Sequence, residues 1–94
     1  MPAYMLVEVA IQSQELYEEY KKKTPASLLP FDGKFLVRGL PVEALEGSWD
    51  HDRLVILEFA TKEKALSWYH SPEYQEAKQL RDRAATARFL LIGD

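Results

Sequence analysis

Apolar residues alternate with other residues in four stretches of the chain, residues 3–11, 34–39, 53–60 and 86–92. A period of two is typical of β-strands, because successive side chains of a strand point to opposite faces. After the first and third stretches, apolar residues recur at spacings of three and four, which indicates amphipathic helices. The pattern therefore predicts the order strand, helix, strand, strand, helix, strand.

Serine, threonine and proline residues mark the expected ends of the helices. Ser13 and Thr61 stand before the two helical segments as N-cap residues, and Ser71 followed by Pro72 restarts the second helix. Pro25 is expected to end the first helix, since proline has no N–H group for a helical hydrogen bond, with one further turn from Ala26 to Leu29 as a continuation before Pro30. The second helical region should consist of two consecutive parts.

Two connections flank the second strand. Asp32–Gly33 predicts a chain reversal into that strand. Residues 40–52 connect it to the third strand and contain Pro41 and Gly47, with some strand character expected at Val42 to Leu45. We therefore expect a long hairpin loop between the second and third strands.

The predicted element order is that of the ferredoxin-like, split βαβ fold. This fold is α+β, with a four-stranded antiparallel sheet in the order 4-1-3-2 and both helices on one face. We expect residues 1–94 to form one such domain. A domain of this size removes only about 60% of its unfolded surface from water, so a partner chain would add to its stability.

The alternation also divides the sheet into two faces. The face expected under the helices carries no charge and includes Met5, Val7, Val9, Ile11, Phe35, Val37, Val55, Leu57 and Phe59. The opposite face has one charge among the aliphatic residues of each strand, in the sets Tyr4, Leu6 and Glu8; Leu36 and Arg38; Leu54, Ile56 and Glu58; and Arg88, Leu90 and Ile92.

A sheet face open to water is usually more polar than this opposite face. We therefore expect a second copy of the chain to cover it, in a homodimer formed through Leu6, Leu36, Leu54 and Ile56. A monomer whose long loops fold over the face is the alternative.

The expected strand order pairs the charges of that face, Arg38 with Glu58 and Arg88 with Glu8. One interpretation is two structural ion pairs, closely matched because an unpaired buried charge is costly. The other is a polar cleft of Arg38, Glu58 and Arg81, in which arginine holds a carboxylate and Glu58 is the candidate catalytic residue for a proton. An organic acid or an aromatic carbonyl compound would suit such a cleft.

Aromatic residues offer a surface for the apolar part of such a ligand. Trp68, Tyr69, Tyr74, Tyr17 and Tyr20 could line an aromatic pocket, with Trp68, Tyr69 and Tyr74 as the candidate ligand-binding residues. At helical spacing the same residues are also typical of an ordinary hydrophobic core.

The chain resembles a known family, domain-of-unknown-function family 1330, over nearly its whole length. The segments that carry the resemblance are Phe35 to Gly39, Glu46–Gly47, Leu54 to Phe59, Trp68 to Tyr74 and Arg81. Residues that match the family pattern are Gly33, Arg38, Gly39, Glu46, Gly47, Glu58, Trp68, Tyr69, Ser71, Tyr74 and Arg81. Many members have His-Gly-Gly where this chain has Phe31–Asp32–Gly33, so no imidazole is available there.

The resemblance implies a dimeric α/β barrel with a ferredoxin-like subunit. Proteins of this group include cofactor-independent monooxygenases, haem-degrading enzymes and muconolactone isomerase-like proteins. A monooxygenase- or isomerase-like enzyme, and a structural or regulatory dimer without a ligand, are therefore alternatives to a small-molecule-binding protein.

Composition narrows the function classes further. The chain has no cysteine, and its net charge of −3 provides no basic field for nucleic acid. No apolar run approaches the roughly 20 residues of a membrane-spanning helix, so we expect a cytoplasmic protein without a membrane partner. His51 and His70 are the only imidazoles, and their spacing suits no metal site. We expect neither a metal nor another cofactor.

Overall fold

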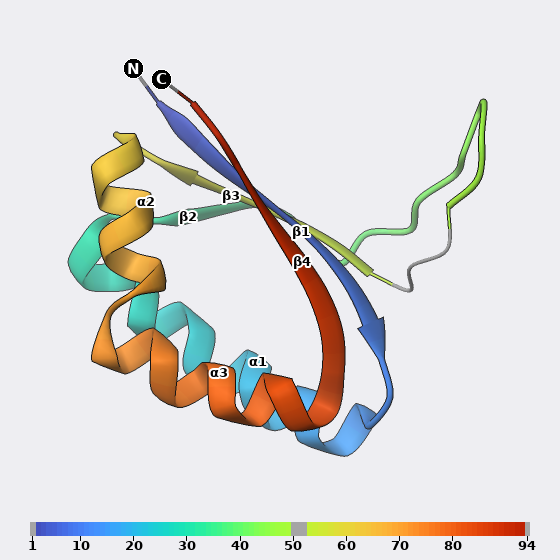
Figure 1. Cartoon of the computed structure of the whole chain (residues 1–94), viewed down its shortest axis with the longest axis horizontal. Coiled ribbons are helices and arrows are strands. Elements are labelled where there is room, and N and C mark those ends of the chain that lie inside the picture. Colours follow the sequence, from blue (N-terminus) through green and yellow to red (C-terminus); the bar gives the residue numbers. More distant parts are fainter. Residues whose placement is uncertain (1, 50–52, 94) are drawn as a thin grey trace.

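Four strands form one antiparallel sheet in the computed structural model, which describes residues 2–49 and 53–93. The elements in chain order are β1 (Ala3–Ile11), α1 (Gln14–Leu28), the 3-10 helix η1 (Leu29–Phe31), β2 (Lys34–Arg38), β3 (Arg53–Phe59), α2 (Lys62–Tyr69), α3 (Pro72–Ala84) and β4 (Ala85–Ile92). The strand order is β2-β3-β1-β4, and the helices lie on one face of the sheet (Figure 1). The predicted ferredoxin-like fold is confirmed.

Side-chain caps begin the helices where the sequence predicts them. The hydroxyls of Ser13, Thr61 and Ser71 each accept a hydrogen bond from the backbone N–H three residues further on. Each cap satisfies one of the N–H groups that a helix start leaves without a helical partner. Pro72 occupies the first turn of α3, where its missing N–H costs nothing.

The expected end of α1 at Pro25 is wrong, because the helix continues through this residue to Leu28. Proline at this position cannot donate a hydrogen bond to the carbonyl of Lys21, one turn earlier. The Nη2 atom of Arg38 donates to that carbonyl instead, at 3.0 Å. A donor from β2 thus replaces the hydrogen bond that the helix lacks.

The strand character expected at Val42 to Leu45 is also absent from the structure. Residues 39–49, which we call the arm loop, contain no strand. The described pairing of β2 with β3 stops at Arg38, so a strand beyond it would have no neighbour for its backbone hydrogen bonds. Figure 1 shows the arm loop projecting beyond the sheet, away from the helices.

An extra residue in β2 corrects the predicted faces of that strand. The register pairs Lys34 with Glu58, Phe35 with Leu57, Val37 with Ile56, and Arg38 with Val55. Leu36 is therefore the additional residue of a β-bulge, which reverses the alternation after it. As a result, Arg38 lies on the helix-covered face and Val37 on the open face, the reverse of the prediction.

The bulge also changes the ion pairs expected on the open face, which we define by Tyr4, Leu6, Glu8, Lys34, Leu36, Val37, Leu54, Ile56, Glu58, Arg88, Leu90 and Ile92. The pair of Arg88 with Glu8 is confirmed, since Arg88 Nε donates to Glu8 Oε2 at 2.7 Å. The pair of Arg38 with Glu58 is wrong, because the bulge moves Arg38 to the other face. Lys34 is the residue opposite Glu58.

The hydrophobic core lies between the helix-covered face and the helices. Its largest fully buried side chains are Trp68, Tyr17, Tyr74, Phe59, Leu57 and Val9. The strand positions predicted to lie under the helices are mostly buried, including Met5, Val7 and Val55. No helix within the described part of the chain is long and apolar enough to cross a membrane.

Candidate functional site

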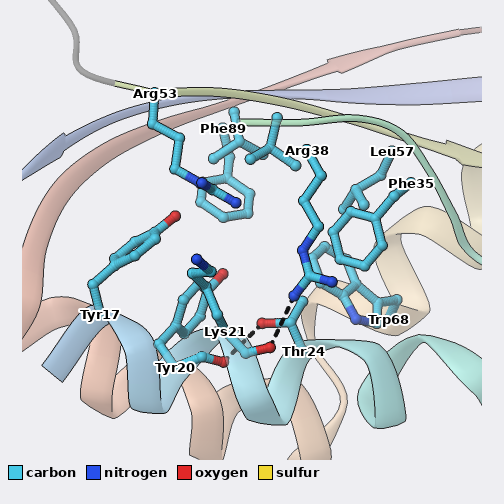
Figure 2. Close-up of a pocket in the computed structure, with 12 residues that line it drawn as sticks. Tyr17, Tyr20, Lys21, Thr24, Phe35, Arg38, Arg53, Leu57, Trp68 and Phe89 are labelled. Atoms are coloured by element: carbon cyan, nitrogen blue, oxygen red, sulfur yellow. Dashed lines mark hydrogen bonds between the residues drawn. The ribbon is translucent and has the colours of Figure 1, made fainter. Parts of the chain in front are cut away.

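A pocket lies between α1 and the helix-covered face of the sheet, close to the ends of β2 and β3 from which the arm loop begins (Figure 2). Its floor is apolar and consists of Val7, Phe35, Val55, Leu57, Trp68 and Phe89. Its polar side consists of Tyr17, Tyr20, Lys21, Thr24, Arg38 and Arg53. The pocket therefore combines an aromatic interior with cations at one end.

The space in the pocket is narrow in this conformation. The empty space between its atoms is about 360 Å³, open solvent included, but the centre of a water molecule can occupy only about 20 Å³ of it, which is room for little more than one water molecule. A ligand with an aromatic ring can enter only if side chains at the mouth move.

Arg38 is the side chain that extends across the mouth. Its guanidinium carbon lies 4.3 Å from the centre of the Phe35 ring, within the range of a cation–π contact. Its Nη2 atom donates to the Lys21 carbonyl, so the side chain links β2 to α1 (Figure 2). Because Arg38 is exposed, it can change partners without burying an unpaired charge.

Arg53 lies on the other side of the mouth, where its guanidinium carbon is 5.5 Å from the centre of the Tyr17 ring. Gly39 provides the space for this side chain. A Cβ atom at Gly39 would lie 2.0 Å from Arg53 Nη1, and the backbone at Gly39 has a φ of +72°. Only glycine combines this backbone conformation with this close approach at little cost.

The mouth continues into an open groove that carries more positive charge. The groove is lined by Glu18, Lys21, Lys22, Arg38 and Arg53, three of which also line the pocket. Hydrogen bonds from Lys21 and Gln14 lower the pKa of Glu18. Four cations surround one carboxylate here, although the chain as a whole has a net charge of −3.

The tyrosines near the pocket are proton donors at neutral pH. Burial raises the pKa of Tyr17, Tyr20 and Tyr74. The hydroxyls of Tyr20 and Tyr74 are 2.9 Å apart and share a hydrogen bond. Because these phenols keep their protons, they can donate a hydrogen bond to an oxygen atom of a ligand. They are not bases that could remove a proton from a ligand.

Trp68 is a fully buried residue of the floor and is held in place by α1. Its Nε1–H group donates to Ser27 Oγ at 3.0 Å, and the Ser27 hydroxyl donates to the Thr24 carbonyl at 2.7 Å. Both bonds are buried, so they fix the indole ring against the helix that forms the opposite wall.

Comparison with known proteins relates this arrangement to a family. The sequence matches the family described as a domain of unknown function, DUF1330, over residues 2–94. The chain belongs to the DUF1330 family. Comparison with curated proteins gives no match.

Several solved structures share the fold of this DUF1330 protein. A protein of unknown function from Rhodopseudomonas palustris is 21% identical, with a TM-score of 0.82 over 99% of this chain and 82% of that one. SnoaB, a cofactor-independent oxygenase from Streptomyces nogalater, is 11% identical, with a TM-score of 0.69 over 99% and 92%. A dimeric protein of unknown function from Bacteroides fragilis, described as having a ferredoxin-like fold, is 12% identical, with a TM-score of 0.65 over 99% and 96%.

The DUF1330 chain brings only part of the predicted site together. Arg38 and Trp68 line the pocket, and so do Tyr17 and Tyr20 from the expected aromatic set. Tyr69 and Tyr74 pack on Trp68 from behind, with ring centres 6.5 and 4.2 Å from it.

The expected cleft of Arg38, Glu58 and Arg81 is not formed. Glu58 lies on the open face, opposite Tyr4 and Lys34, whereas Arg38 is on the helix-covered face. Arg81 is only 6% exposed and packs behind the pocket, with its guanidinium carbon 4.6 Å from the centre of the Phe89 ring. Its Nη2 atom contacts Asp82 at 3.2 Å.

Sequence reasoning missed Arg53 and Lys21, although the pattern contains a signal for each. Arg53 has the same alternation as Val55 and Leu57, which places it on the helix-covered face. Lys21 follows Tyr17 by four residues, so the two share one side of α1.

The sequence predicts no metal site at His51 and His70, and only His70 is among the residues that the structure describes. His51 lies outside the described residues. Among the residues that are described, no group of three or more histidine, cysteine, aspartate or glutamate side chains could hold a metal ion.

Proposed function

We propose that this DUF1330 protein binds a small aromatic organic acid in the pocket between α1 and the sheet. The observation that carries the proposal is the continuity of an aromatic floor at Trp68 with a mouth that holds Arg38 and Arg53. A ligand with a flat apolar body and one carboxylate matches both ends of this pocket.

Arg38 provides a route for the ligand to enter. In the free protein its guanidinium donates to a neutral carbonyl, that of Lys21. A carboxylate is a stronger acceptor, because a hydrogen bond between two charged groups is roughly twice as strong as a neutral one. If Arg38 exchanged the Lys21 carbonyl for the carboxylate of a ligand, its side chain would move away from the mouth. The same exchange would anchor the ligand.

Binding is favoured over acid–base chemistry by the groups that line the pocket. Within the described part of the lining there is no carboxylate and no imidazole. Burial raises the pKa of Tyr17 and Tyr20, so neither phenol is a base at neutral pH. Glu58, the candidate catalytic residue from the sequence, is on the other face of the sheet and has no role in this proposal.

Arg81, Tyr69 and Tyr74 enter the proposal as supporting residues. Arg81 packs on Phe89, and the two tyrosines pack on Trp68, so all three stabilise aromatic walls that a ligand would contact. We expect Arg81→Met to weaken ligand binding less than Arg38→Met does.

We further propose that the protein functions as a homodimer whose open sheet faces pack together through Leu6, Leu36, Leu54 and Ile56. This face carries no helix and is rich in aliphatic residues, which is unusual for a surface in contact with water (Figure 1). The description of the Bacteroides fragilis protein as dimeric agrees with this proposal.

Thermal stability in the presence of aromatic acids tests the binding proposal. Benzoate and naphthoate should raise the melting temperature of the protein, while benzamide, which has the ring but no charge, should not. Arg38→Met should remove the increase. Arg83→Met, which changes an exposed arginine on α3, should keep it. The proposal fails if no aromatic acid shifts the wild-type protein, or if Arg38→Met responds as the wild type does.

The same acids separate binding from catalysis. Each acid that binds is incubated with the protein in air, and its absorption spectrum is followed over time. An unchanged spectrum is expected of a binding protein. Conversion of the acid would favour the monooxygenase- or isomerase-like alternative.

A further inference from the structure

Exposed apolar side chains are concentrated on one side of the molecule. Of the eight large hydrophobic side chains that are exposed in the described part of the chain, six belong to the open face or the arm loop: Leu36, Leu90, Ile92, Leu40, Val42 and Leu45. The other two, Leu29 and Leu66, are on helical elements. Such a one-sided distribution indicates a surface that another protein covers.

The arm loop projects on the side of the sheet that has no helices (Figure 1). Leu45 is 88% exposed. The root of the loop is fixed, because the Gly39 N–H donates to the Leu54 carbonyl at 2.9 Å. From this root, the residues up to Leu45 can reach about 20 Å in extended form. The shortest dimension of the molecule is 16 Å, so the arm loop is long enough to contact a neighbouring copy beyond the edge of its own sheet.

The charges of the arm loop identify the kind of partner. Residues 39–49 contain Glu43 and Glu46 and no lysine or arginine. An acidic loop is repelled by anionic lipid, so the apolar residues beside these charges do not suit a membrane surface. The β4 edge of the open face offers a cation instead, since the Arg88 side chain remains 65% exposed while it pairs with the buried Glu8. The other carboxylate of this face, Glu58, is on β3.

We propose that the arm loop packs against β4, the exposed edge strand of a second copy of this chain, with Leu40, Val42 and Leu45 on the open-face side of that strand. This inference rests on the proposed homodimer and adds to it a second contact region outside the sheet-to-sheet interface. A two-fold interface requires a surface that complements itself. One chain carries both halves here: an acidic, apolar arm loop, and an apolar face with a cation.

The proposal also accounts for the difference between the sequence pattern and the isolated chain. Val42 to Leu45 has strand character in sequence, but the single chain provides no neighbouring strand for it. The strand order leaves β4 at an edge of the sheet, with unpaired backbone groups. The edge strand of a second copy supplies the missing neighbour.

Cysteine cross-linking tests the proposed contact directly, because the chain has no cysteine of its own. The double variant Leu45→Cys with Leu90→Cys should form a covalent dimer under mild oxidation. Two controls set the background: each single variant, and Leu45→Cys combined with Leu29→Cys on the helical side. The arm-loop contact is excluded if the first pair cross-links no faster than the controls.

A second variant measures the contribution of the arm loop to assembly. Leu45→Asp should weaken dimerisation about tenfold or more, measured by light scattering over a range of concentrations, with an unchanged circular dichroism spectrum. The matched variant Leu29→Asp should not. If the wild type is a dimer and Leu45→Asp dimerises equally well, the proposed arm-loop contact is wrong, while the proposed sheet interface is unaffected. A monomeric wild type overturns both proposals.

Discussion

Arg38 on β2 donates a hydrogen bond to the one carbonyl that Pro25 leaves without a helical partner. The proline therefore does two things at once. It removes a donor from the interior of α1, and it exposes an acceptor, the Lys21 carbonyl, at the mouth of the pocket. The arginine that closes the pocket is held by a defect in the helix opposite.

Pro25→Ala tests this relationship. Alanine supplies an N–H to the Lys21 carbonyl, so α1 gains a hydrogen bond and Arg38 loses its acceptor. Proline in a helix interior is about 3 kcal/mol less favourable than alanine, and the lost bond to Arg38 offsets only about 1 kcal/mol of that difference. We expect a more stable protein, measured by urea denaturation, that also binds an aromatic acid more tightly. Unchanged stability together with unchanged affinity would contradict this role of Pro25.

Ser27→Ala tests the support of the pocket floor. The variant leaves the Trp68 Nε1–H group without its partner in a fully buried position. An unsatisfied buried donor costs about 1–3 kcal/mol, so we expect a loss of this size in the free energy of unfolding. Ser67→Ala, at an exposed position of α2, is the control. Equal stabilities of the two variants would show that the hydrogen bond does not matter.

Alkaline pH should destabilise the fold through its buried tyrosines. An ordinary tyrosine has a pKa near 10.0, and burial raises the pKa of Tyr20 and Tyr74 in the folded chain. Above pH 10 the unfolded chain therefore binds fewer protons than the folded one. The contribution of these tyrosines to the free energy of unfolding should be fully present below that pH. As the pH rises above 10, the free energy of unfolding should fall by about 1.4 kcal/mol per pH unit for each such tyrosine.

Tyr74→Phe provides the check on this pH dependence. The variant should lose one tyrosine's share of the slope when urea denaturation is repeated between about pH 9 and pH 11. Its stability at neutral pH will also change, since Tyr20 loses a hydrogen-bond partner, but that change does not depend on pH. A slope identical to that of the wild type would assign the alkaline loss to other groups.

Ile56→Glu tests the open face as a dimer interface. The variant places a charge without a partner at the centre of the proposed contact, so the protein should become monomeric or insoluble. Leu66→Glu introduces the same charge at an exposed position of α2 and should leave assembly unchanged. Light scattering and denaturant titration measure both effects, and a folded, dimeric Ile56→Glu protein of normal stability would refute the placement.

The alternation of apolar residues was sufficient to predict the order of elements, because strand and helix periods are local properties of the sequence. Ser13, Thr61 and Ser71 located the helix starts for the same reason, since a cap acts within one turn. The pair of Arg88 with Glu8 followed from strand order without any register slip.

The features that could not be predicted depend on two distant segments at once. The bulge at Leu36 is a property of the pairing between β2 and β3, and the alternation of β2 alone does not reveal it. The continuation of α1 past Pro25 depends on a donor thirteen residues further along the chain, Arg38. The candidate site is where these two features meet, which is why its arginine was expected on the wrong face.

The bulge at Leu36 gives this fold an unusual evolutionary freedom. Loss of the codon for Leu36 would remove the bulge and still leave Val37 opposite Ile56 and Arg38 opposite Val55, so the arginine would stay at the pocket with every strand and helix retained. Two descendants of one gene could thus differ by this deletion and present the same arginine to a ligand. In alignments of related chains, a gap opposite residue 36 is therefore compatible with an unchanged pocket.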